Sequence, residues 1–185
     1  MNIRPYCNDD CENVRYVCLN ADGPCRMSKR GKNFILNVYC NYFIEKEAGN
    51  CFVAADENGK AIGYILCAEN FDRFYESYVN EYVTRLKKYE FSHRRSAFRS
   101  IESQQKYKED YPAHLHIDIL PEYQHMGLGR KLMDALCNHL RDKGVKGIVL
   151  TVWKGNDNAR RFYEKYGFTL IETKKSSVVY ALKLT

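Results

Sequence analysis

The stretch HLHIDILPEYQHMGLGRKLMDALCNHL, residues 114–140, decides the fold of this 185-residue chain. It starts with an apolar run from His114 to Leu120, breaks at Pro121, and passes through a loop that holds two glycines. Apolar residues then recur every three or four positions up to Leu140. This order predicts a strand, a turn and an amphipathic helix.

The turn before this helix is a candidate anion site. Gly127 and Gly129 lie where the first backbone N–H groups of a helix are unpaired and the helix dipole is positive, which favours a phosphate. A side chain at either position would hold a diphosphate away from the backbone. Arg130 and Lys131 add full positive charges. Glycine also starts helices for structural reasons alone, so this motif by itself is a weak signal.

A second motif, NDNARRFYEKYGFTLIE, follows at residues 156–172. Gln-x-x-Gly-x-Gly, which starts at Gln124, and Asn-x-x-Ala-x-x-x-Tyr-x-x-x-Gly-Phe, which starts at Asn156, together resemble the GCN5-related N-acetyltransferase (GNAT) family. The resemblance covers roughly residues 112–172, and residues 1–70 only in the order of elements. Residues 111–124, YPAHLHIDILPEYQ, also resemble the group related to the acetyltransferase-like domain of O-GlcNAc hydrolases.

The resemblance implies an α/β (α+β) fold with a mixed, mostly antiparallel sheet of six or seven strands. The two central parallel strands are expected to splay apart, helices to flank the sheet, and a helical insertion to precede the fourth strand. Residues 1–185 are expected to form one N-acetyltransferase domain. The implied function is acetyl-CoA-dependent transfer of acetyl to a primary amine by direct attack in a ternary complex. The alternative is a catalytically silent acyl-CoA-binding or regulatory module of the same fold.

The resemblance also assigns the binding of acetyl-CoA to a set of residues along both motifs. Asn156 has a simpler interpretation, as the N-cap of the last helix. The set comprises Ile119, Leu120, Gln124, His125, Met126, Gly127, Leu128, Gly129, Arg130, Lys131, Asn156 and Phe162.

Three side chains are candidates for catalysis. Tyr163 matches the tyrosine that lies near the sulfur in the family, and a phenol can protonate a thiolate; alternatively it only packs beside Phe162. Asp118 and His116 alternate on one face of the strand and are candidates for the base. A bulge in this strand would reverse their facing, so alternation alone leaves the base open. Each histidine singly fits a core position, whereas Asp118 is expensive to bury without a partner.

Around this centre we expect a first strand at residues 3–6, a helix that starts at Asp9, and a second helix over residues 31–46. Residues 51–68 predict a hairpin that turns at Asn58-Gly59. After the central helix we expect a buried strand, GIVLTVW, parallel to the 114–120 strand. A last helix, residues 157–166, is expected to end at Gly167, and a hairpin closes the sheet.

Residues 71–112 carry aromatic side chains at helical spacing, among them Tyr75, Tyr78, Tyr82 and Tyr89. We expect this insertion to cover the acceptor end of the site, with Tyr75, Tyr78 or Tyr82 turned partly toward the cavity; alternatively it packs on the sheet or on a second copy of the chain, as a homodimer. Its basic run is most often typical of a solvated face, so we do not expect a nucleic-acid partner. That run consists of Arg85, Lys87, Lys88, Arg94, Arg95 and Arg99.

Composition sets the remaining expectations. The formal charge of +6 suits an anionic ligand such as CoA, and equally suits nucleic acid. Eight cysteines without any Cys-x-x-Cys pair favour reduced thiols and no metal site. No apolar stretch reaches the length of a membrane span and no signal peptide is evident, so we expect a cytoplasmic protein without a membrane partner. The acceptor is expected to be a small-molecule or peptide amine.

Overall fold

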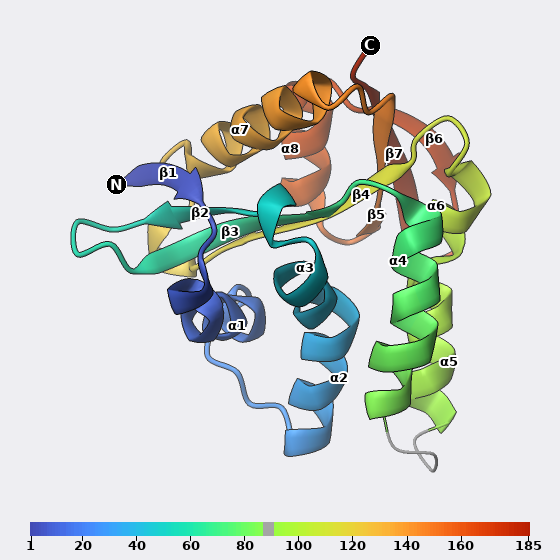
Figure 1. Cartoon of the computed structure of the whole chain (residues 1–185), viewed down its shortest axis with the longest axis horizontal. Coiled ribbons are helices and arrows are strands. Elements are labelled where there is room, and N and C mark those ends of the chain that lie inside the picture. The colour runs from blue at the N-terminus through green and yellow to red at the C-terminus, as the bar shows by residue number, and fades with distance from the viewer. Residues whose placement is uncertain (87–90) are drawn as a thin grey trace.

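The predicted apolar strand is β4, Ala113–Ile119, in the middle of a seven-stranded sheet (Figure 1). The computed structural model describes residues 1–86 and 91–185. The strand order is β1-β2-β3-β4-β5-β7-β6, and β4–β5 is the parallel pair among antiparallel neighbours. The other strands are β1 Asn2–Pro5, β2 Phe52–Ala55, β3 Ala61–Ala68, β5 Gly147–Trp153, β6 Thr169–Thr173 and β7 Ser177–Lys183. The predicted mixed sheet, its parallel central pair and its two hairpins are confirmed.

Helices cover both faces of the sheet (Figure 1). One face carries α7, Leu128–Asp142, and α8, Asp157–Tyr166; the other carries α1, Cys11–Asn20, α2, Lys29–Tyr39, and α3, Asn41–Lys46. The apolar stripe of α7 is buried against β1–β4, as its spacing predicts. The helix expected over residues 31–46 is two helices, because Cys40 leaves the helical conformation with φ −133° and ψ −61°.

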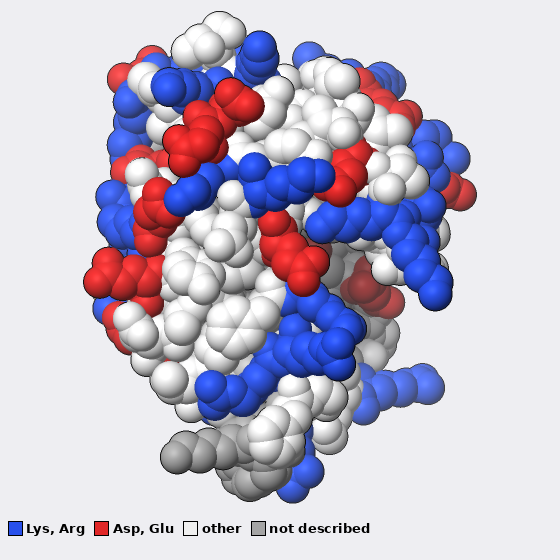
Figure 2. Space-filling view, turned by 90° about the vertical axis from the view of Figure 1, so that its right-hand side faces the viewer, with Lys and Arg blue, Asp and Glu red and all other residues white. Residues whose placement is uncertain are grey.

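The insertion forms α4, Phe71–Ser77, α5, Phe91–Ser100, and α6, Glu102–Tyr107. Helix α5 packs on α2, and α6 packs on β5. Figure 2 shows Lys and Arg side chains interleaved with Asp and Glu on the side of the molecule that carries the insertion. Ion pairs such as Lys106–Glu172, at 3.0 Å, and Lys108–Asp72 lie among these elements. This mixture of signs differs from the continuous basic stripe that binds nucleic acid. Lys87, Lys88 and Tyr89 lie outside the described residues.

The register between β3 and β4 decides which way the β4 side chains face. The pairing runs without a shift from Gly63–Ile119 to Ala68–His114, so no bulge interrupts the ladder between β3 and β4. His114, His116 and Asp118 therefore share one face, the side covered by α1–α3. Ile119 faces the other side, where its side chain lies 3.7 Å from the position a Cβ on Gly129 of α7 would take. The register therefore decides the facing of these side chains, which alternation along the strand alone left open.

In the described part of the chain, no helix is long and apolar enough to span a bilayer.

Candidate active site

β4 and β5 separate soon after they meet. Only Ala113–Ile148 and His114–Val149 are paired between them in the described structure, so the edge of β4 beyond His114 lacks a strand partner on that side. The Leu120 N–H donates to the Ile62 carbonyl of β3 at 3.0 Å. Because backbone groups in an antiparallel strand alternate in direction, the Ile119 N–H points to the unpaired edge. This edge can receive an extended ligand by backbone hydrogen bonds, as expected for Ile119.

Leu120 does not offer the same contact. Its N–H is bound to Ile62, and its carbonyl accepts from the Tyr123 N–H at 2.9 Å. Its side chain is buried as well. Both polar backbone groups of Leu120 thus serve the fold, and its predicted role in binding the cofactor stays a prediction that these groups do not support.

The loop from β4 to α7 presents the start of the helix to solvent. Gly127, the N-cap residue, has φ +78°, and no side chain caps the helix at this end. The first helical bond joins the Lys131 N–H to the Gly127 carbonyl at 3.3 Å, which leaves the N–H groups between them free for a ligand. His125, Met126, Arg130 and Lys131 are exposed around this end, and Leu128 is buried beneath it. These unpaired N–H groups and the positive φ of Gly127 are the features that an anion site needs, and the anion site itself stays a prediction.

The two positions of the motif are occupied by glycine for different structural reasons. A Cβ on Gly127 would meet nothing within 4 Å, so the positive φ requires glycine there. A Cβ on Gly129 would lie 3.3 Å from the ring of Phe162. Gly129 therefore admits the packing of α8 on α7, which is a structural reason for glycine beside the predicted approach of a diphosphate. Phe162 is half-buried over the start of α7.

Two amides of the predicted set are engaged by the protein itself. The Gln124 amide donates to the Ile119 carbonyl at 2.9 Å and to the Ala21 carbonyl at 3.2 Å. Gln124 thereby ties the end of β4 to the loop between α1 and α2. The Asn156 side chain accepts from the Ala159 N–H at 3.0 Å, so it caps α8, as its simpler interpretation predicts.

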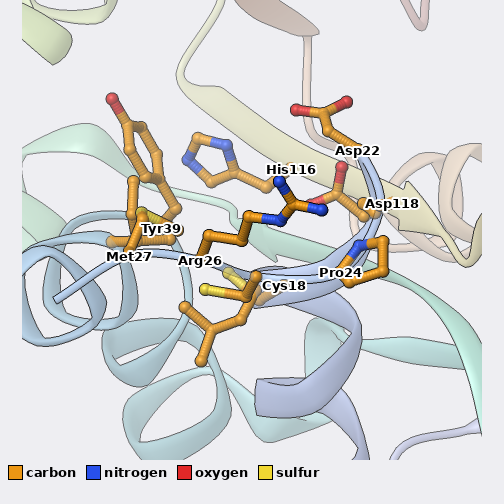
Figure 3. A pocket seen from close by; sticks show the side chains of 13 residues that line it. Cys18, Asp22, Pro24, Arg26, Met27, Tyr39, His116 and Asp118 are labelled. Carbon is orange, nitrogen blue, oxygen red and sulfur yellow. The ribbon is translucent and has the colours of Figure 1, made fainter. Parts of the chain in front are cut away.

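A pocket of about 440 Å³ opens on the α1–α2 side of β4 (Figure 3). His116 and Asp118 form its floor, and the loop after α1 and one side of α2 form its walls. Figure 3 shows Tyr39 and Met27 on one side, Asp22 and Asp118 on the other, and Arg26 reaching across. The remaining lining residues are Cys18, Leu19, Ala21, Gly23, Pro24, Cys25 and Ile35.

Asp118 is the titratable group that the pocket presents to a ligand. Burial raises the pKa of its carboxyl, the hydroxyl of Tyr64 lowers it by donating a hydrogen bond, and the negative charge of Asp22 raises it, to about 7 in balance. Tyr64 lies directly opposite Asp118 on β3 and is fully buried. A carboxyl with this pKa exchanges a proton at neutral pH, which suits a general base.

The two histidines of the same face are held neutral. Burial lowers the pKa of His116 to about 4 and that of His114 to about 3. The His116 ring packs edge-on against Tyr39 and Phe43, each at 5.1 Å between ring centres. Neither ring nitrogen of His114 has a hydrogen-bond partner among the described residues. His114 is a core residue. His116 lines the floor of the pocket in its neutral form, and its lower pKa makes it a weaker base than Asp118.

Tyr163 lies on α8, on the other face of the sheet, where its ring packs against Phe162 and Phe168. Its side chain is buried, and no hydrogen bond to its hydroxyl is found among the described residues. Burial raises the pKa of the phenol, and the charge of Asp118 raises it further. The base and acid candidates thus interact across the unpaired edge of β4.

A family model described as the acetyltransferase (GNAT) family matches residues 24–168. The chain belongs to the GNAT family. A solved structure described as SsHAT is 26% identical, with a TM-score of 0.85 over 100% of this chain and 98% of that one. The PaiA N-acetyltransferase of Thermoplasma acidophilum, solved in complex with coenzyme A, shares the fold at 18% identity, a TM-score of 0.61 and 98% coverage of both chains.

The match to a curated relative is shorter. The [ribosomal protein bS18]-alanine N-acetyltransferase of Haemophilus influenzae is 41% identical over 61 residues, 33% of this chain. This GNAT chain therefore spans about two fifths, 41%, of the length of that relative.

In this GNAT chain, the described part of the insertion does not line the pocket that the aromatic stripe predicts it to cover. None of its described residues lines the pocket over His116 and Asp118. Tyr78 and Tyr82 are fully buried, and their hydroxyls donate to the Ala97 carbonyl at 3.2 Å and to Glu45 at 3.0 Å. Their predicted turn toward the cavity is wrong, because both hydroxyls find partners inside the protein. Tyr75 is half-buried against Phe71.

The loop of residues 21–27 supplies much of the pocket wall, and no sequence signal predicts this role. Its Gly23 and Pro24 indicate only a break after the preceding helix, and the loop has no periodic pattern. The described residues contain no cluster of His, Cys, Asp and Glu side chains that could hold a metal ion. All eight cysteines are free thiols, and Cys40, Cys51, Cys67 and Cys137 are buried.

Proposed function

We propose that this GNAT protein is an acetyl-CoA-dependent N-acetyltransferase that transfers acetyl to a primary amine by direct attack in a ternary complex. The observation that supports it best is the unpaired edge of β4 beyond His114, since Asp118 lies on one face of the sheet there and, in addition to burial, raises the pKa of Tyr163 on the other. Two surfaces with different chemistry flank this point: an open helix start that suits a diphosphate, and a pocket with a carboxyl at its floor. A relative named for acetylating alanine nitrogen supports an amine acceptor.

The residues present fit the cofactor. The N–H groups of Leu128, Gly129 and Arg130 at the start of α7 would hold the diphosphate, with Arg130 and Lys131 beside them. The Ile119 N–H at the edge of β4 would bind an amide or the reacting carbonyl oxygen. Acetyl-CoA, when bound, supplies an activated thioester and a thiol leaving group.

Asp118 serves as the base. Its carboxyl titrates with a pKa of about 7, so at neutral pH it takes the proton that the acceptor ammonium must lose before attack. The Tyr64 hydroxyl holds one carboxylate oxygen, which fixes the direction of the other. Tyr64 is therefore a positioning residue.

Tyr163 serves as the donor to the leaving group. Its raised pKa keeps the proton on the phenol oxygen at neutral pH. Because part of that rise comes from the Asp118 charge, protonation of Asp118 makes Tyr163 a stronger acid. The proton that Asp118 gains early thus prepares Tyr163 to release its own proton later.

The test is CoA release from acetyl-CoA with a panel of primary amines, together with calorimetry of acetyl-CoA binding. We expect turnover that Asp118→Asn lowers by roughly two orders of magnitude while acetyl-CoA affinity is kept. Binding without turnover on any amine would favour the silent acyl-CoA-binding module. Cys18 and Cys25 line the pocket, so the competing mechanism is a ping-pong reaction through an acetylated cysteine. Parallel lines in double-reciprocal plots of the initial rate, together with an acetylated cysteine, would refute direct attack. We expect intersecting lines, and we expect the Cys18→Ser, Cys25→Ser double variant to stay active.

Placement in the group related to the acetyltransferase-like domain of O-GlcNAc hydrolases stays a prediction. Nothing in the proposed chemistry depends on it, since function resides in the site rather than in the fold.

A further inference from the structure

The pocket over Asp118 has two chemically different ends. Figure 3 shows the carboxyls of Asp22 and Asp118 on one side. Met27 and Tyr39 stand on the other side, and Ile35 of α2 also lines the pocket. No ion pair of Asp22 or Asp118 is found among the described residues. Arg26 reaches across the pocket toward these carboxyls without forming one, so they can accept a further cation.

The dimensions favour a short, branched acceptor. A volume of about 440 Å³ is at the small end of ligand pockets. An amine at Asp118 with an apolar group against Ile35 and Met27 would fill both ends. The ammonium of a lysine side chain, at the tip of an unbranched stem, would leave the apolar wall unused.

Resting on the proposed acetyl transfer, we propose that the acceptor is an α-amine whose α-carbon bears a large apolar side chain, and that Met27, Ile35 and Tyr39 select that side chain. The source is a free amino acid or the first residue of a peptide, since both carry this chemistry.

The acid–base match supports the same choice. A peptide α-amine has a pKa of about 7.7–8.0, whereas a lysine amine is near 10.4. Asp118, with a pKa of about 7, can take a proton from the α-amine at little cost, and from lysine only against a difference of about three units.

The experiment measures kcat/KM for peptides that share one tail and differ in the first residue, which is leucine, methionine, alanine or glutamate. Free leucine and an N-terminally blocked peptide with one lysine complete the panel. We expect leucine and methionine peptides to exceed the alanine peptide by about tenfold or more. The blocked lysine peptide should be the poorest substrate. Free leucine tells the two sources apart, because a peptide-specific site should acetylate it poorly.

Variants test the wall directly. Ile35→Thr keeps the branched shape on α2, and Met27→Ser changes a side chain that is 39% exposed, so it leaves the fold unthreatened. We expect both to raise KM for the leucine peptide several-fold, and to raise KM for the alanine peptide by a clearly smaller factor. Leu170→Thr on β6, 45% exposed and outside the pocket, is the matched control and should change neither.

The outcomes separate the two proposals. This inference would be overturned, and acetyl transfer left standing, by any of three results. These are equal rates for the alanine and leucine peptides, a preference for the glutamate peptide through Arg26, or faster transfer to the blocked lysine peptide. Acetyl-CoA binding with no transfer to any acceptor would overturn the proposed function, and this inference with it.

Discussion

Replacing Tyr64 by phenylalanine should move the pH dependence of catalysis without disturbing the binding of acetyl-CoA. Tyr64 is fully buried and donates its hydroxyl hydrogen bond to Asp118, which lowers the pKa of that carboxyl. A hydrogen bond to a charged group contributes roughly 1.5–3 kcal/mol, and one pKa unit corresponds to about 1.4 kcal/mol. Tyr64→Phe should therefore raise the pKa of Asp118 from about 7 by roughly one unit or more.

The sign follows from the role of Asp118 as a base. The base must be ionised, so kcat/KM rises with pH through the pKa of Asp118, and in Tyr64→Phe that rise should shift to higher pH. A shift of one unit lowers kcat/KM at pH 7 by about fivefold, and most of the loss should be recovered near pH 9. The amine titrates equally in both proteins, so the difference between their profiles isolates Asp118.

Tyr42→Phe is the matched control. Tyr42 is also buried, and its hydroxyl donates to a carboxylate, Glu47, at 3.0 Å. Tyr42→Phe should lower the melting temperature in thermal unfolding about as much as Tyr64→Phe does, and it should leave the pH dependence of kcat/KM unchanged. If Tyr64→Phe lowers kcat/KM by one factor at every pH, Tyr64 is only a packing residue and the assignment of Asp118 as the base loses its main support.

Four further outcomes are expected. Gly127→Asp should weaken acetyl-CoA binding in calorimetry by tenfold or more, because its carboxylate would meet the diphosphate, whereas Gly127→Asn, which tolerates the same backbone, should keep more affinity. Tyr163→Phe should lower kcat by up to roughly a hundredfold at unchanged acetyl-CoA affinity; full kcat would reduce it to packing. Gln124→Ala should raise the acceptor KM more than the acetyl-CoA Kd, since Gln124 holds the loop at Ala21. The unsubstituted protein should lose ~2 kcal/mol of unfolding free energy between pH 8 and pH 5, because His114 gains a proton at pH 5 only in the unfolded chain. His114→Leu should lack this loss, as measured by denaturant titration at both pH values.

Local signals made the central part of the fold predictable. The break at Pro121 and the glycines after it separate the apolar run of β4 from the periodic α7, and both elements need only neighbouring residues to be recognised. The hairpin at Asn58-Gly59 is predictable for the same reason. The break of the second helix at Cys40 was not, because it has no proline or glycine signal and follows from packing in the buried layer.

The candidate site was predictable only where a motif carried it. Tyr163 lies within the motif that starts at Asn156, and Asp118 lies in the apolar run just before the motif that starts at Gln124, whereas Tyr64 and Asp22 have no sequence signal of their own. Tyr64 gains its role from its register opposite Asp118, and Asp22 from a loop almost a hundred positions away in the chain. Tyr78 and Tyr82 show the opposite failure, because helical spacing predicts which side chains share a face and not which surface covers them.

The splayed pair of strands explains why chemistry concentrates at the end of β4. Were β5 paired with β4 along its whole length, the Ile119 N–H would be used in the sheet and Tyr163 on one face could not influence Asp118 on the other. Separation after His114 removes that barrier while β3 still holds β4 through a shift-free register. His114, still within the paired part, is enclosed and inert; Asp118, beyond it, lines the pocket and, in addition to burial, raises the pKa of Tyr163. One change in pairing along a seven-residue strand therefore divides a structural histidine from a reactive carboxyl.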